Sequence, residues 1–220
     1  ELWQYEAALF CCDRNEIKAY MLRRLKPGLG GGKTIFVTVD EVASAHIKEL
    51  AAVYPVLNAD KAKDADMRFC RFIEGVFDKR IVSSVFLTGE GFENNWYPTS
   101  LRVLCNGRRA FIGNNLYSKG ACYTAYRKMF MHIEDPVYLS EDKLTDQITV
   151  NMRVNGQEMW YPIVSWGSHW YESNNQWEVL LEDTEDIELH IESLVQGTLK
   201  TEVIPLGRLP KRGEYSMRLQ

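Results

Sequence analysis

Apolar residues recur with two different spacings along the chain, and the spacing changes near Asp135. Before this point, apolar runs of strand length alternate with segments whose apolar residues recur every three to four positions, the spacing of one helix face. After it, apolar and polar residues alternate one by one in several short segments, as in half-buried strands. The pattern predicts an α/β region over residues 1–135 and an all-β region over 136–220.

The α/β region opens with a predicted hairpin, in which the apolar runs 7–12 and 17–22 are joined by a polar tetrapeptide, 13–16. A short strand over 35–39 ends at Asp40, and a helix is expected to follow. Its apolar stripe comprises Ala43, Ile47, Leu50, Ala51 and Tyr54, with Pro55 just beyond. The remaining predicted elements are a helix over 64–77, a buried strand over 82–88, a helix over 98–105, a strand over 109–112 and a helix over 118–131.

The second region shows a strong hairpin signal. Ile148, Val150, Met152 and Val154 alternate with polar residues and run into Asn155-Gly156. Further strands are predicted over 159–164, 177–181, 187–191, 199–206 and 215–219. Several short strands without a helical pattern predict a small β sandwich or barrel.

The overall composition makes some classes of function unexpected for this chain. Of the 220 residues, 45% are hydrophobic, which is enough for a buried core. The net charge of -4 provides no basic field, so neither nucleic acid nor a membrane is an expected partner. No apolar run is long enough for a membrane span and no secretory signal is evident, so we expect a cytoplasmic protein. The chain lacks an initiator Met and opens on a strand-like segment, which favours a fragment.

Cysteine usage fits a reducing compartment. The count is odd, no CxxC spacing occurs and the residues lie in apolar runs, so we predict reduced, buried and unreactive thiols. They are Cys11, Cys12, Cys70, Cys105 and Cys122.

Local motifs for metal binding or catalysis are missing from the sequence. The run Gly28 to Thr34 resembles a P-loop, but Pro27 stands where the pattern needs glycine and the run opens a strand, so a flexible connector is the better interpretation. The four histidines stand in separate predicted elements without partners at ligand spacing. We therefore predict neither a metal site nor catalytic residues.

Aromatic residues are dense in the second region, and their role has two interpretations. They are either a stacking platform for sugars or peptides, or the core of a small β domain, which we favour because large rings fill such a core efficiently. The cluster comprises Trp160, Tyr161, Trp166, His169, Trp170, Tyr171 and Trp177.

The block 85–127 is the most informative part of the sequence. An apolar strand delivers the chain to the turn Gly89-Glu90-Gly91, where small residues let backbone approach a ligand. A later helix is expected to begin near Ser118, with its hydroxyl as cap and Gly120 and Ala121 in the first turn, a terminus that favours anions.

This block is similar to the adenosine-side segment of actin-like ATPases, in the form found in DnaK-type chaperones. Residues 85–91 match the strand and turn, and Lys119-Gly120-Ala121 match the start of the later helix. The chain resembles more closely an uncharacterised bacterial family of chaperone-like ATPase homologues. In that family a GFxxxW segment, here Gly91 to Trp96, recurs with a cysteine, paired arginines and an NLYSKGACY motif, here Asn115 to Tyr123.

The resemblance implies a fold, α/β plus all-β: the C-terminal part of an actin-like (ribonuclease H-like) ATPase lobe, followed by a small β sandwich. It implies a nucleotide-binding site formed by Gly89, Glu90, Gly91, Lys119, Gly120, Ala121 and Asp13. Asp13 stands in the hairpin that corresponds to a phosphate loop, but that hairpin lacks glycines, and Glu90 replaces the second turn glycine. Glu90 would accept hydrogen bonds from a ribose, repel phosphates, or simply be solvated.

The function that follows is a chaperone-like or pseudo-ATPase regulatory protein, in which nucleotide alters how the β domain engages a protein or peptide partner. ATP or ADP with Mg²⁺ is expected in the full-length protein, and neither cofactor nor ATPase activity in this fragment, because catalysis needs groups from both lobes. The alternatives are a carbohydrate-binding β module and a structural scaffold without nucleotide binding.

Overall fold

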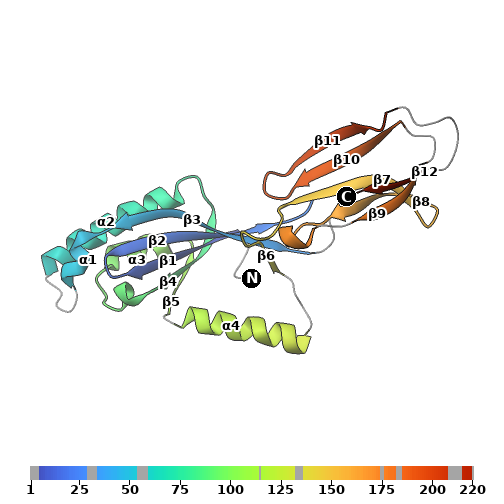
Figure 1. Cartoon of the computed structure of the whole chain (residues 1–220). Helices are drawn as coiled ribbons and strands as arrows, with labels where there is room; N and C mark the ends of the chain where they lie inside the picture. Colours follow the sequence, from blue (N-terminus) through green and yellow to red (C-terminus); the bar gives the residue numbers. More distant parts are fainter. Residues whose placement is uncertain are drawn as a thin grey trace. The chain divides into compact units, whose positions relative to one another are not determined.

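The computed structural model describes residues 5–28, 34–53, 59–113, 115–131, 136–173, 176–181, 185–207 and 215–219. The chain forms two compact units (Figure 1). Unit 1 comprises Glu1–Arg24 and Val37–Glu134, and unit 2 comprises Leu25–Phe36 and Asp135–Gln220. Residues 25–36 therefore group with the second unit, although the sequence pattern places them within the first region. Most of the glycine-rich connector, 29–33, lies outside the described residues.

Strand β1 lies inside a mixed sheet in unit 1. It pairs antiparallel with β2 and parallel with β4, and β4 pairs parallel with β5. Within unit 1 the strand order is β5-β4-β1-β2-β3. The strands of unit 1 are β1 (Glu6–Asp13), β2 (Glu16–Leu25), β3 (Phe36–His46), β4 (Val82–Thr88) and β5 (Arg109–Ile112). The hairpin, β4 and β5 are confirmed predictions.

The helices of unit 1 cover three of the predicted helices, 64–77, 98–105 and 118–131. Six helical elements are present in the described residues of this unit. They are α1 (Lys48–Val53), α2 (Ala59–Phe77), the short 3-10 helix η1 (Glu90–Phe92), α3 (Pro98–Cys105), α4 (Leu116–Tyr126) and its π-helical continuation η2 (Arg127–Met131). Helix α2 begins five residues earlier than predicted, and α3 has the predicted bounds. None of the described helices is long and apolar enough to cross a membrane.

The helix expected directly after Asp40 is wrong in its first half. Residues up to His46 continue β3, and only Lys48–Val53 is helical. Ala43 and Ile47 fit a helical stripe, but the same stretch also fits an extended strand beside β2, and sheet pairing decides for the strand. Tertiary context has overridden the local pattern.

Aromatic rings fill the core of unit 1. Phe69 of α2 is fully buried, and its ring lies 5.6 Å from that of Phe10 on β1. The rings of Phe92, Trp96 and Tyr97 surround it at 5.4, 5.8 and 6.5 Å. The core thus joins β1, α2 and the segment that follows β4, because one large ring contacts all three.

Asp66 of α2 holds the start of α3. Its side chain is buried and accepts hydrogen bonds from the backbone N–H groups of Thr99 at 2.7 Å and Ser100 at 2.8 Å, and from the Ser100 hydroxyl at 2.6 Å. Burial by itself raises the pKa of Asp66, but these hydrogen bonds outweigh it and lower the pKa below its usual 3.8. A charged cap from another helix therefore fixes α3.

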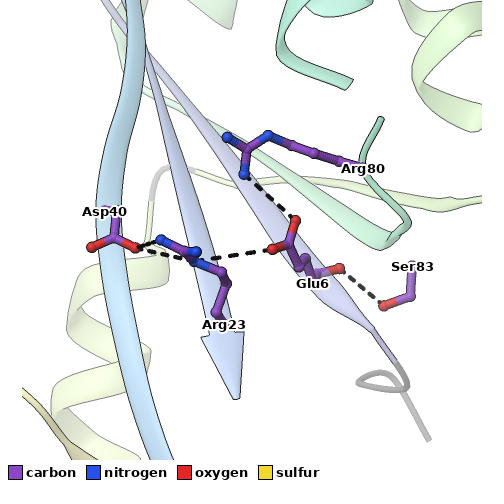
Figure 2. Close-up of polar contacts among 5 residues, drawn as sticks. All are labelled: Glu6, Arg23, Asp40, Arg80 and Ser83. Atoms are coloured by element: carbon purple, nitrogen blue, oxygen red, sulfur yellow. Dashed lines mark hydrogen bonds and ion pairs between the residues drawn. The ribbon is translucent and has the colours of Figure 1, made fainter. Parts of the chain in front are cut away.

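A row of charged side chains lies beyond the apolar core, on the same face of the unit 1 sheet (Figure 2). Arg23 of β2 donates to Asp40 of β3, with Nε 3.1 Å from the carboxylate, and also lies 4.0 Å from Glu6 of β1. Arg80, in the turn before β4, lies 3.7 Å from the other oxygen of Glu6. The Ser83 hydroxyl donates to the Glu6 carbonyl at 3.2 Å. The row links three neighbouring strands.

Unit 2 is built mainly of antiparallel strands. One sheet has the order β11-β10-β7-β8, and β12 pairs with β9 in another. Its strands are β6 (Val137–Tyr138), β7 (Asp146–Val154), β8 (Gln157–Val164), β9 (Trp177–Leu181), β10 (Asp186–Ser193), β11 (Thr198–Pro205) and β12 (Tyr215–Leu219), with a 3-10 turn η3 (Trp170–Glu172). Asn155 and Gly156 join β7 to β8 with φ of 52° and 81°, so the predicted hairpin is confirmed.

The fold class is therefore a mixed α/β sheet followed by an antiparallel β region. The predicted strands of the second region are all present within one or two residues.

Candidate functional site

Three parallel strands end together at one edge of the unit 1 sheet. Cys11 of β1 stands opposite Thr88 of β4, and Leu87 stands opposite Ile112 of β5. The Gly113 N–H then donates to the Leu87 carbonyl at 3.1 Å. Ligands of open α/β sheets bind beyond the carboxyl ends of the strands. This edge is therefore the candidate functional site, and Asp13, the Gly89 turn and the segment that leads to α4 all follow strands that end there.

The Gly89 turn packs directly on β1. Gly89 has a φ of +102°, and a Cβ there would lie 2.2 Å from the Cys12 carbonyl oxygen. A Cβ on Gly91 would lie 2.1 Å from the Cys12 sulfur. Both glycines are thus required by contact with Cys12, which is a different reason from the ligand approach that the sequence suggested.

Two aromatic side chains anchor the same turn. The Trp96 indole N–H donates to the Gly91 carbonyl at 2.7 Å, and the Tyr97 hydroxyl donates to the Phe92 carbonyl at 3.1 Å. Both side chains are buried. The GFxxxW spacing is the sequence signal for this clamp, because it places the indole beside the carbonyl five residues earlier.

The carboxylates of the site lie at its surface. Asp13 ends β1 and is exposed, and Glu90 begins η1 and is also exposed. Beneath them, burial raises the pKa of the Cys12 thiol to about 12, helped by the neighbouring Cys11 and Asp13. Cys12 is therefore a protonated packing residue, while the two carboxylates are accessible to a ligand.

Helix α4 begins earlier than predicted, which changes the roles of its first residues. It starts at Leu116, and the Ser118 hydroxyl donates to the Asn115 carbonyl at 3.1 Å instead of capping free N–H groups. The Lys119 N–H already donates to the same carbonyl at 3.0 Å. The prediction of Ser118 as the cap is wrong, because the helix starts two residues before it. Lys119 to Ala121 thus lie one turn inside the helix.

Lys119, Gly120 and Ala121 point to different sides of α4, and none of them is covered. All three residues are exposed, and a Cβ on Gly120 would meet nothing within 4 Å. Packing against described residues therefore does not explain the glycine at this position. Gly120 differs in this respect from Gly89 and Gly91.

Tyr117, in the first turn of α4, lies near Cys11 of β1, although its side chain is 66% exposed. Removal of part of the side chain from water raises the pKa of the Tyr117 hydroxyl, and the nearby Cys11 thiol raises it further. Sequence periodicity gave no means of predicting this neighbour.

The cysteine prediction is largely wrong. Only Cys12 is buried; Cys11 and Cys70 are half-buried, and Cys105 and Cys122 are exposed. Cys105 ends α3, and Cys122 lies on α4, none of whose residues is buried. An apolar run indicates burial only when its element packs against another on that side. All five thiols are free.

The aromatic cluster of unit 2 is mostly not core. Trp160, Trp170 and Tyr171 are 39%, 64% and 55% exposed. Trp166 is half-buried and donates its indole N–H to the Glu192 carbonyl at 3.1 Å, so among the cluster's tryptophans with described side chains it is the one that serves as a packing residue. The side chain of Trp177 lies outside the described part. The core interpretation is wrong for these three rings, because each of them is open to solvent.

Histidine and acidic side chains form no metal centre in the described residues. His169 instead pairs with Asp142, with 2.7 Å between Nδ1 and the carboxylate, and His190 stacks on Trp160 with 3.5 Å between ring centroids. His132 lies outside the described residues.

The fold and the site define a two-part protein whose α/β unit carries a candidate ligand site at its strand ends. The chain belongs to the family of unknown function DUF5716, whose C-terminal model matches residues 1–141. Residues 143–220 match a domain of unknown function, DUF8552. No curated protein matches the chain.

Solved structures similar to the chain include two from Aquifex aeolicus. One is a member of the Ppx/GppA protein family, at 8% identity and a TM-score of 0.33, with 92% of this chain and 52% of that chain covered. The other is the type II variant of the Ppx/GppA phosphatase, at 9% identity and a TM-score of 0.30, with 92% and 53% covered. This chain spans about half the length of these structures.

Proposed function

We propose that the edge formed by the ends of β1, β4 and β5 binds the adenosine side of a nucleotide, ATP or ADP with Mg²⁺, in the full-length protein. The observation that carries the proposal is the convergence of three parallel strand ends on one edge, where open α/β sheets bind ligands. In this arrangement unit 1 is part of an actin-like ATPase lobe. Gly89, Glu90 and Gly91 form one wall of the site, and Lys119, Gly120 and Ala121 form another.

Three features of the site support this assignment. Gly120 is exposed, and no neighbouring side chain accounts for its lack of a Cβ, so a ligand can approach the helix backbone there. Lys119, beside it, supplies a cation for a phosphate. Asp13, at the end of β1, is exposed and is placed to contact a metal-bound water.

The function that we infer is regulatory. Nucleotide at this edge alters how the β region, a small sandwich, engages a protein or peptide partner, as in a chaperone-like ATPase or a pseudo-ATPase in a bacterial cytoplasm. Unit 1 of this chain by itself supplies only one side of the site, so hydrolysis would need groups from elsewhere in the full-length protein.

A thermal-shift titration of the full-length protein with Mg-ADP and Mg-ATP tests the nucleotide site. We expect a saturable rise in melting temperature, because a ligand that binds only the folded state stabilises it. Gly120→Val should abolish this rise. Gly75→Val is the matched control, since Gly75 also lies inside a helix with nothing within 4 Å of its Cβ position. Equal nucleotide binding by Gly120→Val and wild type would show that α4 is not part of the site.

A carbohydrate-binding role for unit 2 is a second candidate, and the exposure of Trp160, Trp170 and Tyr171 favours it. Exposed aromatic rings stack on the apolar faces of sugars. A glycan array with unit 2 in the full-length protein tests this role, with Trp170→Ala expected to remove any signal. A full signal from Trp170→Ala would exclude this platform.

A further inference from the structure

A groove runs between strand β3 and helix α2 in unit 1, and none of its lining residues belongs to the proposed nucleotide site. Its volume is about 310 Å³, at the lower end of the range for ligand pockets. Val42 of β3 and Phe72 and Val76 of α2 form apolar walls. Arg71 of α2 and Arg80, which follows the helix, line the same groove. It is therefore an apolar groove with guanidinium groups among its lining residues.

A helical glycine keeps this groove open. Gly75 lines it from the interior of α2, and a Cβ at this position would meet nothing within 4 Å. Its backbone has no positive φ that would call for glycine. Glycine in a helix interior is less favourable than alanine. Neither packing nor backbone conformation accounts for Gly75, whereas an open groove does.

The charges around the groove favour an anion. Arg80 lies 3.7 Å from Glu6, farther than a hydrogen bond, and Glu6 is shared with Arg23 (Figure 2). Arg23 also binds Asp40. Among the described residues, no side chain pairs with Arg71. Arg23 and Arg80 thus meet two carboxylates, and Arg71, which lines the groove, adds one further positive charge.

We propose that this groove binds a small amphiphilic anion: a short apolar chain that carries one carboxylate or phosphate group. The chain lies between Val42, Phe72 and Val76 and is removed from water there. The head group accepts hydrogen bonds from Arg71 and Arg80, because planar guanidinium groups bind carboxylate and phosphate oxygens in pairs. The proposal goes beyond the nucleotide site and does not depend on it.

The test is a titration of the full-length protein with hexanoate and with hexyl phosphate, followed by backbone amide NMR shifts. We expect saturable shifts in β3 and α2 with at least one of the two probes, which also identifies the preferred head group. Hexanol should bind at least fivefold more weakly because it lacks the charge. Acetate and inorganic phosphate should bind at least fivefold more weakly because they lack the apolar chain.

Variants locate the binding in the groove. Gly75→Leu fills it and should weaken binding at least tenfold, with Gly75→Ala intermediate; both residues favour the helix, so the fold is retained. Arg71→Gln should weaken binding at least fivefold. The matched controls are Lys63→Leu, an exposed position of the same helix, and Arg102→Gln, an exposed arginine of α3, and both should bind as wild type does.

Three results would overturn the proposal. The first is the absence of saturable shifts in β3 and α2 with both probes. The second is wild-type affinity in Gly75→Leu. The third is equal affinity for hexanoate and acetate together with equal affinity for hexyl phosphate and phosphate, which would mean that the apolar walls take no part.

Discussion

Helices α2 and α4 both belong to unit 1, but they differ in what they bury. Helix α2 buries five side chains: Ala65, Asp66, Phe69, Ile73 and Val76. Helix α4 buries none, and Tyr123 and Tyr126 are 70% and 54% exposed. An isolated helix of eleven residues is marginally stable in water, so exposed large side chains contribute little to holding it.

The contrast between α2 and α4 distinguishes residues whose identity is explained by packing from residues whose identity is not. On α2, the apolar stripe is explained by the core around Phe69, whereas the open Gly75 is not, nor is Arg71, which pairs with no side chain of the described residues. On α4, packing against the described residues accounts for the identity of hardly any side chain. Functional residues are best sought among those whose identity packing does not explain, which is why an open glycine supports each proposal.

The largest expected effect on stability comes from removing the ring of Phe69, the α2 residue at the centre of the unit 1 core. Phe69→Ala should lower the free energy of unfolding of unit 1 by about 3–5 kcal/mol, because a fully buried ring leaves a cavity. On α4, Tyr123→Ala should change it by less than about 0.5 kcal/mol. Urea denaturation of both variants measures the difference. Comparable losses in the two variants would refute the contrast between the helices.

The next effect concerns Asp66, the polar residue of the buried stripe. Asp66→Ala should cost about 1–3 kcal/mol, because two backbone N–H groups at the start of α3 lose their acceptor. Urea denaturation at neutral pH measures the loss. An unchanged free energy of unfolding would mean that water replaces the cap without cost.

Asp66 also gives a pH dependence with a definite sign. Its pKa in the folded state lies below the usual 3.8, so its charged form stabilises the fold above that pH. The stabilisation is lost as the pH falls through the folded-state pKa. Asp66→Asn should therefore show a smaller loss of stability than wild type on acidification below about pH 4.

A smaller effect on stability is expected for Trp96, which belongs to the core and also anchors the Gly89 turn of the candidate site. Trp96→Phe keeps most of the buried ring but removes the donor to the Gly91 carbonyl, which should cost about 1–2 kcal/mol. In the full-length protein it should also weaken nucleotide binding, because the Gly89 turn loses its clamp. Denaturation and thermal-shift titration of the same variant measure both. Wild-type nucleotide affinity in a destabilised Trp96→Phe would separate the clamp from the site.

The smallest expected effect is a difference in thiol reactivity between the cysteine of α2 and the cysteine of α4. Cys70 on α2 is half-buried, and burial together with Glu74 and Asp66 raises its pKa. Cys122 on α4 is exposed. A thiol reagent at pH 8 should label Cys122 several times faster than Cys70, because thiolate is the reactive form. Mass spectrometry of partially labelled protein gives the two rates, and faster labelling of Cys70 would contradict the burial of α2.

The sequence by itself determined most of the elements and their order. Alternation of apolar and polar residues predicted β7 and β10, the Asn155-Gly156 turn predicted its hairpin, and the stripe that includes Phe69 and Ile73 predicted α2. These signals succeed because each depends on residues close together in the chain: φ preference at a turn, and one repeated spacing on a buried face. The ends of β1, β4 and β5 were also predicted, and with them the positions of Asp13 and the Gly89 turn.

Only the tertiary structure decided which neighbours these elements meet. The course of β3 through Ala43 was settled by pairing with β2, and the exposure of Cys122 by the absence of any buried residue on α4. The reason for Gly89 and Gly91 is contact with Cys12, about eighty residues earlier in the chain. The groove of Arg71 and Arg80 likewise needs a wall from β3. Packing across such separations depends on three-dimensional proximity, which no local spacing in a single sequence encodes.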